Sequence, residues 1–197
     1  MATFALLLAR HMGARVFATS RDPRKRAMAM ELGAEDAFDS AEPYPVTADI
    51  VVDSIGPATW EYSMRTLRHG GRMCVCGGTS GPKVELNLPR LFFKQLDIIG
   101  ASCGSQEEFR HVTDLVADGL PVIVDEVVPL SEYPAALERL RTATQLGKMM
   151  KAKDPTCVTA RTEAARAGPS GAEHAAFDPA SVDVESRPQQ RSSEGGA

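Results

Sequence analysis

The chain has 197 residues, of which 43% are hydrophobic and 24% charged, a composition typical of a globular domain with a short appendage. Its formal net charge of -4 argues against a nucleic-acid partner, because contact with phosphates needs a basic surface. No apolar run reaches the ~20 residues that span a bilayer, and the first residues lack the basic segment of a signal peptide, so we expect a cytoplasmic protein without a membrane partner.

Predicted helices and strands alternate along the first 120 residues. In chain order, the sequence predicts a helix at 2–11, a strand at 14–20, a helix at 23–30, strands at 37–38 and 49–55, a helix at 57–67, a strand at 72–76, a helix at 89–95, a strand at 96–101 and a helix at 106–118. Asp22 followed by Pro23 is a strong start signal, because the carboxylate caps free N–H groups and proline suits the first turn. Ser105 and Glu108 have the spacing of a capping box.

This alternation predicts an α/β fold with a Rossmann-like, doubly wound parallel sheet and right-handed crossovers. Gly70 and Gly71 are predicted to turn the chain before strand 72–76. The character of the sequence changes near residue 150. Residues 151–197 are rich in Ala, Pro, Gly, Ser, Arg and Glu and contain few apolar side chains, so they cannot offset the entropy cost of ordering. We therefore predict a disordered tail over 151–197.

A doubly wound sheet binds its ligand beyond the carboxyl ends of its strands. In this chain those ends carry short segments rich in glycine and serine, at 53–56, 77–81 and 100–104. Glycine lets the backbone approach a flat ligand closely. The sequence therefore predicts a ligand site formed by these loops together with the end of strand 14–20.

Five segments carry a family resemblance. In order and spacing, LGAEDAFD, VVDSIG, LRHGGRMCVCGG, DIIGA and PLSEYPAALERL resemble the carboxyl-terminal half of zinc-type alcohol dehydrogenases and quinone reductases, in the medium-chain dehydrogenase/reductase family. The resemblance implies a dinucleotide-binding domain over 1–120 and a segment at 121–150 that returns to a catalytic domain. It also implies hydride transfer between a nicotinamide dinucleotide and a carbonyl, alcohol or activated alkene, in a family whose members are often homo-oligomers.

In that family the strand-end loops line the ribose and nicotinamide of the cofactor. The resemblance thus implies cofactor contacts at Asp53, Ser54, Gly56, Gly77, Gly78, Thr79, Ser102 and Lys148. The carboxylate of Asp53 is itself predicted to cap the turn at the end of its strand. Lys148 is predicted to lie beside the cofactor or on the surface rather than to form a Schiff base.

The end of the first predicted strand favours NADPH over NADH. An NAD-selective site needs an acid there to bind the ribose diol, but the residues are Ser20 and Arg21. Arg24, Lys25 and Arg26 add positive charge to the first turn of a helix, where the macrodipole disfavours it and a 2′-phosphate would relieve the conflict. We predict phosphate contacts from Ser20, Arg21 and Lys25, and a solvated basic face is the alternative interpretation.

The cysteines, histidines and Trp60 do not indicate a metal or catalytic site. The cysteines are Cys74, Cys76, Cys103 and Cys157. They form no CxxC pair and no histidine stands at zinc-ligand spacing, so we predict no zinc or other metal in this chain. The candidate catalytic histidines are His11, His69 and His111. None has a triad-like partner, so we predict surface roles for them, a packing role for Trp60 and no catalytic residue.

The resemblance also indicates what is missing. In the family, a strand and a glycine-rich turn that holds the pyrophosphate precede the helix that begins here at Ala2, and an amino-terminal catalytic domain carries any zinc ligands and most of the substrate pocket. Without that strand, segments 14–20 and 49–55 have no common neighbour. We therefore expect a fragment that folds poorly and is inactive alone, with Met1 either a misplaced start or the start of a genuine remnant.

Two other functions are compatible with these residues. One is a non-catalytic remnant or partner-binding module that pairs its open sheet edge with another chain. The other is a methyltransferase with an adenosine-containing donor. The basic cluster from Arg21 to Arg26 argues mildly against the methyltransferase, because that donor has no phosphate.

Overall fold

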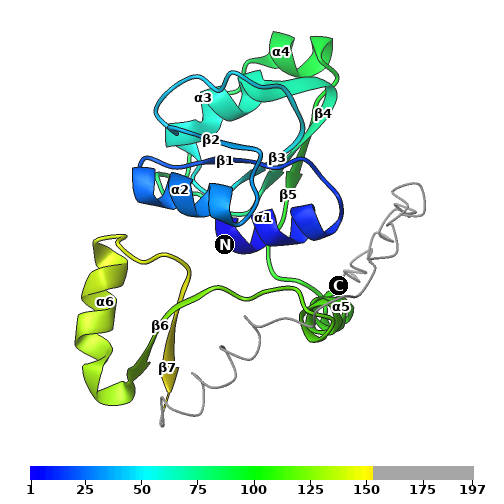
Figure 1. The fold of residues 1–197 in the computed structure, drawn as a ribbon. Coiled ribbons are helices and arrows are strands. Elements are labelled where there is room, and N and C mark those ends of the chain that lie inside the picture. The colour runs from blue at the N-terminus through cyan, green and yellow to red at the C-terminus, as the bar shows by residue number, and fades with distance from the viewer. Residues whose placement is uncertain (153–197) are drawn as a thin grey trace, which may run out of the picture.

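The computed structural model describes residues 1–152 as an alternation of helices and strands (Figure 1). The elements are α1 (Ala2–His11), β1 (Phe17–Thr19), α2 (Pro23–Glu31), β2 (Asp36–Phe38), β3 (Ala48–Asp53), α3 (Pro57–Thr66), β4 (Leu67–Val75), α4 (Leu88–Phe93), β5 (Asp97–Gly100), α5 (Gln106–Ala117), β6 (Val124–Pro129), the 3-10 helix η1 (Leu130–Glu132), α6 (Tyr133–Arg141) and β7 (Lys148–Ala152). The predicted tail at 151–197 overlaps the last two residues of β7, and its remainder lies outside the described residues.

The helix starts follow the capping signals in the sequence. The carboxylate of Asp22 accepts a hydrogen bond from the backbone N–H of Arg24 at 2.9 Å, directly before α2. At α5 the Ser105 hydroxyl accepts from the backbone N–H of Glu108 at 3.1 Å, and the Glu108 carboxylate accepts from the N–H of Ser105. Both predicted caps are therefore confirmed.

All strand pairs are parallel, as expected for a doubly wound fold. β1 pairs with β2, β3 pairs with β4 and β4 with β5, and β6 pairs with β7. In the three-stranded sheet, Val51 lies beside Met73, and Met73 lies beside Ile98. The predicted α/β class is confirmed, but β1 and β3 belong to separate sheets.

The chain bends at Gly70 and Gly71 as predicted, since a Cβ at Gly71 would lie 2.9 Å from the carbonyl oxygen of Arg68, but the strand continues through the bend. Both residues lie inside β4, which starts at Leu67. Gly70 adopts a left-handed backbone with φ of 68°, and its N–H donates to the carbonyl of Lys94 at 2.7 Å. The ladder to β3 shifts register between Ala48 and Ile50, so the glycines form an irregularity in a continuing strand instead of ending it.

Two apolar clusters hold the elements together. The first consists of Leu6, Leu7, Ala29, Ala34 and Leu120 and joins α1 to α2 and to the end of α5. The second consists of Trp60, Met64, Leu67, Met73 and Leu96 and joins α3 to the three-stranded sheet. Trp60 is buried in this second cluster, which confirms its predicted packing role.

A cavity of about 780 Å³ lies between β1 and β3, and we call it the interstrand cavity. Residues of both strands line it, with α1 and α3 contributing further walls. In the view of Figure 1, α1 lies below these strands and α3 above them. Ile50 and Val52 of β3 are 60% and 55% exposed, far more than is usual in a parallel sheet. Within residues 1–152, no strand pairs with both β1 and β3, as expected.

Candidate functional site

The loops that follow β3, β4 and β5 meet at one edge of their sheet. The backbone N–H of Cys76 donates to the carbonyl of Asp53 at 2.9 Å, and that of Ala101 donates to Val75 at 2.9 Å. Ser80 fastens the first two loops, because its N–H and its hydroxyl both donate to the carbonyl of Ile55, at 2.8 and 2.7 Å. The carboxyl ends of three neighbouring strands therefore form one surface, as ligand binding in this fold class requires.

The buried carboxylate of Asp53 organises the loop after β3. It is 4% exposed, and its Oδ1 atom accepts from the N–H groups of Ile55 at 2.8 Å and Gly56 at 2.9 Å. Its Oδ2 atom accepts from the hydroxyls of Thr59 at 2.9 Å and Ser63 at 3.0 Å. The predicted turn cap is confirmed. With four donors directed at it, this carboxylate holds the loop to the start of α3.

Sequence reasoning missed Ser80, Thr59 and Ser63. A detectable signal existed for the last two, because residues four apart on a helix share one face and both hydroxyls could therefore reach a preceding strand end. Ser80 gave no such signal. Its role depends on how closely two loops approach, which spacing along the chain does not reveal.

Glycines allow that close approach. Gly56 has φ of 88° and ψ of -132°, a backbone conformation that residues with a Cβ rarely adopt. A Cβ at Gly77 would lie 2.8 Å from the carbonyl oxygen of Ser54, and one at Gly78 would lie 2.9 Å from that of Gly81. The glycine-rich loops thus pack backbone against backbone.

We expect Gly56→Ala to lower the free energy of unfolding by about 1–3 kcal/mol, because it forces alanine into a region reserved for glycine. Gly100→Ala is the matched control, because a Cβ there meets nothing within 4 Å and its change should stay within about 0.5 kcal/mol. Urea unfolding of the two variants measures both values. Equal losses would contradict the structural role of the Gly56 conformation.

Two of the four basic side chains after β1 are paired with acids. Arg24 forms an ion pair with Asp22 at 2.8 Å, and the resulting hydrogen bond lowers the pKa of Asp22 to about 2. Arg26 forms an ion pair with Asp39 at 2.9 Å and also donates to the carbonyl of Ser20. These pairs cancel much of the positive charge that the sequence indicated at the start of α2.

Arg21 and Lys25 are placed differently. Lys25 donates from Nζ to the carbonyl of Ala143 at 2.6 Å, a contact with the segment before β7. Arg21 is exposed, and its guanidinium makes no hydrogen bond or ion pair within residues 1–152. It lies next to Ser20, whose hydroxyl accepts from the N–H of Asp22 at 3.2 Å. Arg21 is thus the cation at the end of β1 whose guanidinium donors all remain available to a ligand.

Apart from Arg21, which is not among the residues that line the interstrand cavity, the predicted site residues fall into three groups. Four of them line the interstrand cavity from both sides: Ser20, Lys25, Asp53 and Ser54. Five lie in the loops at the strand ends: Gly56, Gly77, Gly78, Thr79 and Ser102. The Thr79 hydroxyl donates to the carbonyl of Ser54 at 3.5 Å, which links the first two groups. Lys148 begins β7, is exposed, and is not among the cavity-lining residues.

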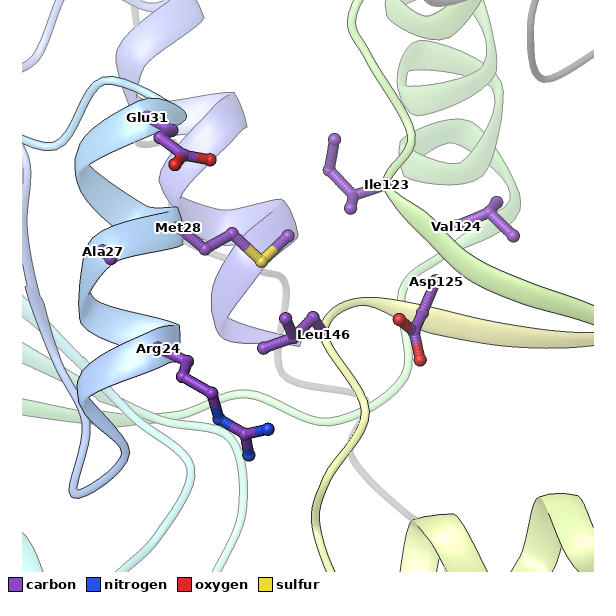
Figure 2. A pocket seen from close by; sticks show the side chains of 8 residues that line it. All are labelled: Arg24, Ala27, Met28, Glu31, Ile123, Val124, Asp125 and Leu146. Atoms are coloured by element: carbon purple, nitrogen blue, oxygen red, sulfur yellow. The ribbon is translucent and has the colours of Figure 1, made fainter.

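A second pocket, of about 460 Å³, lies between α2 and the start of β6 (Figure 2). Met28, Ile123 and Leu146 form its apolar part. Its charged residues are Arg24, which is paired with Asp22, Asp125, which accepts from Arg139 at 2.7 Å, and Glu31. These pairings leave the pocket without an acid–base pair aimed into it.

The remaining reactive groups form no catalytic centre in the described part of the chain. No cluster of three or more His, Cys, Asp or Glu side chains within residues 1–152 is placed to hold a metal ion. His11, His69 and His111 are exposed, and burial raises the pKa of the Cys76 thiol. Cys157 lies outside the described residues. Among the described helices, none has the length and apolar character to cross a membrane.

Comparisons with known proteins agree with this geometry. The sequence profile of the family described as "Zinc-binding dehydrogenase" matches residues 1–118. Acryloyl-coenzyme A reductase of Metallosphaera sedula is 25% identical over 151 residues, which cover 74% of this chain and 46% of the reductase. A polyketide synthase of Streptomyces halstedii is 28% identical over 165 residues, 77% of this chain and 3% of the synthase.

Solved structures show the same fold. A thermostable alcohol dehydrogenase from Pyrobaculum aerophilum superposes with a TM-score of 0.68 at 32% identity, over 76% of this chain and 46% of that one. A crotonyl-CoA carboxylase/reductase in complex with NADP superposes with a TM-score of 0.71 at 20% identity, over 77% and 47%. The chain spans less than half the length of these relatives. It belongs to the zinc-binding dehydrogenase family, of the medium-chain dehydrogenase/reductase type, and corresponds to the carboxyl-terminal half of such proteins.

Proposed function

We propose that this chain is the cofactor-binding part of an NAD(P)H-dependent oxidoreductase that moves hydride between a nicotinamide dinucleotide and a carbonyl, alcohol or activated alkene. The observation that carries the proposal is the fastened set of loops at the ends of β3, β4 and β5, which faces the end of β1 across one cavity. Relatives named as alcohol dehydrogenases and as an acryloyl-coenzyme A reductase support the reaction class.

The residues present fit two parts of a dinucleotide. Ser20 and Arg21 offer a hydroxyl and a guanidinium at the end of β1, where an adenosine ribose would lie. Ser54 and Thr79, with the backbone N–H group of Gly77, offer donors at the ends of β3 and β4 for the second ribose. The bound nicotinamide would supply the hydride, and the protein would orient it.

NADPH is the proposed form of the cofactor. No acid stands at the end of β1 to bind a ribose diol, and the unpaired guanidinium of Arg21 suits a 2′-phosphate. Lys25 already uses one of its three N–H donors on the carbonyl of Ala143, whereas Arg21 uses none within residues 1–152, so Arg21 is the main phosphate contact and Lys25 a secondary one. The relatives include an NAD-dependent dehydrogenase and complexes with NADP, so they support both cofactors. The residues at the end of β1 are therefore the stronger argument for NADPH.

The proposal also divides the chain into two segments. We propose that 1–120 form the cofactor domain and that 121–150 lead back towards a catalytic domain, which would hold the substrate pocket and any zinc. Lys148 would lie on that returning segment. Turnover of a substrate is not expected from this chain alone.

Calorimetric titration of the 197-residue chain with NADPH and with NADH tests the proposal. We expect NADPH to bind at least tenfold more tightly than NADH, which is about 1.4 kcal/mol. Equal binding of the two would remove the NADPH assignment. Absence of binding by either would remove the cofactor-binding function itself.

A further inference from the structure

One arginine of α2 connects the ends of β1 and β2. The Nη1 atom of Arg26 donates to the backbone carbonyl of Ser20 at 2.5 Å and to the carboxylate of Asp39 at 2.9 Å. Ser20 and Asp39 directly follow Thr19 and Phe38, which are partners in the parallel ladder. A single nitrogen atom therefore holds together the two strand ends that adjoin the proposed phosphate site.

Every polar group of Ser20 takes part in this arrangement. Its N–H donates to the carbonyl of Phe38 at 3.0 Å, its hydroxyl accepts from the N–H of Asp22 at 3.2 Å, and its carbonyl accepts from Arg26. Within residues 1–152 the hydroxyl only accepts, so its own hydrogen remains available to a phosphate oxygen. The backbone that leads into Arg21 is thus fixed in advance, which reduces the entropy cost of binding.

Asp39 is the acid that Arg26 neutralises. Its side chain is 37% exposed, and its second carboxylate oxygen accepts from the N–H of Ala41 at 3.0 Å, which holds the carboxylate at the end of β2. A carboxylate at such a strand end suits a ribose diol, whereas it repels a 2′-phosphate because both groups are negative. Without a counter-ion, Asp39 would therefore favour the unphosphorylated cofactor.

The other cations at the start of α2 have different partners. Arg24 pairs with Asp22 and is 63% exposed, and Lys25 donates to the segment before β7. The side chain of Arg26 is only 25% exposed. Solvent and salt screen a partly covered ion pair less than an exposed one, so Arg26 is the effective counter-ion of Asp39.

We infer that Arg26 is a positioning residue that sets the preference for NADPH, because it cancels the charge of Asp39 and fixes the carbonyl of Ser20. The hydroxyl of Ser20 and the guanidinium of Arg21 then meet a phosphate with no uncompensated carboxylate beside them. The inference rests on the proposed dinucleotide site. It assigns the cofactor preference to an ion pair that lies outside the phosphate contacts themselves.

Calorimetric titration of an Arg26→Met variant of the 197-residue chain tests the inference. The dissociation constant of NADPH should rise about tenfold. That of NADH should change less than about twofold, because NADH has no phosphate to be repelled. An equal loss of both affinities would overturn the inference, because it would show that Arg26 only supports the fold.

The double variant Arg26→Met/Asp39→Asn separates neutralisation from direct contact. It removes both charges of the pair, so its NADPH affinity should return to within about threefold of that of the unaltered chain. If Arg26 contacted the phosphate itself, removal of the acid would not restore binding. A double variant as weak as Arg26→Met would therefore overturn the inference.

Arg15→Met is the matched control, because Arg15 pairs with Glu35 at the opposite ends of the same two strands. It removes the same charge and should leave the ratio of the NADPH and NADH affinities unchanged. A loss of NADPH preference equal to that of Arg26→Met would overturn the inference, since the net charge of the chain would then be the cause.

Hydrogen exchange of the free protein gives a readout without cofactor. In Arg26→Met the amide of Ser20 should exchange roughly threefold faster or more, because the two strand ends lose their connection, whereas Arg15→Met should not change it. An unchanged rate in Arg26→Met would overturn the inference. Failure of the unaltered chain to bind either dinucleotide would instead remove the proposed function, and the inference with it.

Discussion

Asp53→Ala is expected to lower the free energy of unfolding by about 3–5 kcal/mol, because each buried donor left without an acceptor costs about 1–3 kcal/mol. The change leaves two backbone N–H groups and the Ser63 hydroxyl without an acceptor in a site that is 4% exposed, whereas the Thr59 hydroxyl keeps the carbonyl of Gly56. It also releases the loop after β3 from the start of α3. Urea unfolding followed by circular dichroism measures the loss.

Asp49→Ala is the matched control on the same strand. Asp49 is exposed and pairs with Arg68, and exposed ion pairs contribute at most about 1 kcal/mol. Asp53→Asn, which keeps one acceptor oxygen, should fall between the two. If Asp53→Ala cost no more than Asp49→Ala, the carboxylate would not organise the loop.

Arg21→Ala should weaken NADPH binding by roughly 10- to 100-fold, the effect of losing a charge-assisted hydrogen bond of about 1.5–3 kcal/mol. NADH lacks the 2′-phosphate, so its affinity should stay unchanged. The guanidinium of Arg21 has no partner within residues 1–152, and no existing ion pair therefore compensates for its loss. Calorimetry with each dinucleotide measures both affinities.

Arg24→Ala provides the comparison, since Arg24 is already paired with Asp22. Its removal should change NADPH affinity less than threefold, a difference of about 0.7 kcal/mol. Equal effects of the two substitutions would indicate that the whole basic face attracts the phosphate. A parallel loss of NADH affinity in Arg21→Ala would place Arg21 elsewhere in the site.

Local sequence signals predicted the helices well because their causes are local. The cap at Asp22 and the capping box of Ser105 and Glu108 involve groups within three residues of each other, so spacing alone reveals them. Strand ends were less predictable. The segment 14–20 forms only a three-residue strand at 17–19, because β2 on its paired side is equally short and its other side has no partner.

The candidate site required contacts that spacing does not reveal. The positive cluster at the start of α2 suggested several phosphate contacts, but the pairing of Arg26 with Asp39 and the hydrogen bond from Lys25 to Ala143 join positions 13 and 118 residues apart. Because these long-range contacts engage Lys25 and Arg26, Arg21 becomes the main candidate for the phosphate contact. The loop glycines were visible in the sequence, whereas the bond from Ser80 to Ile55 that fastens the loops was not.

The most direct test of the account is an NMR map of backbone amides in the 197-residue chain on addition of NADPH. We expect shifts at Arg21 at the end of β1, at 54–56 after β3, at 77–79 after β4 and at Ser102 after β5, with none along α6. Shifts confined to the pocket between α2 and β6, or no shifts at the strand ends, would contradict a dinucleotide site at this edge of the sheet.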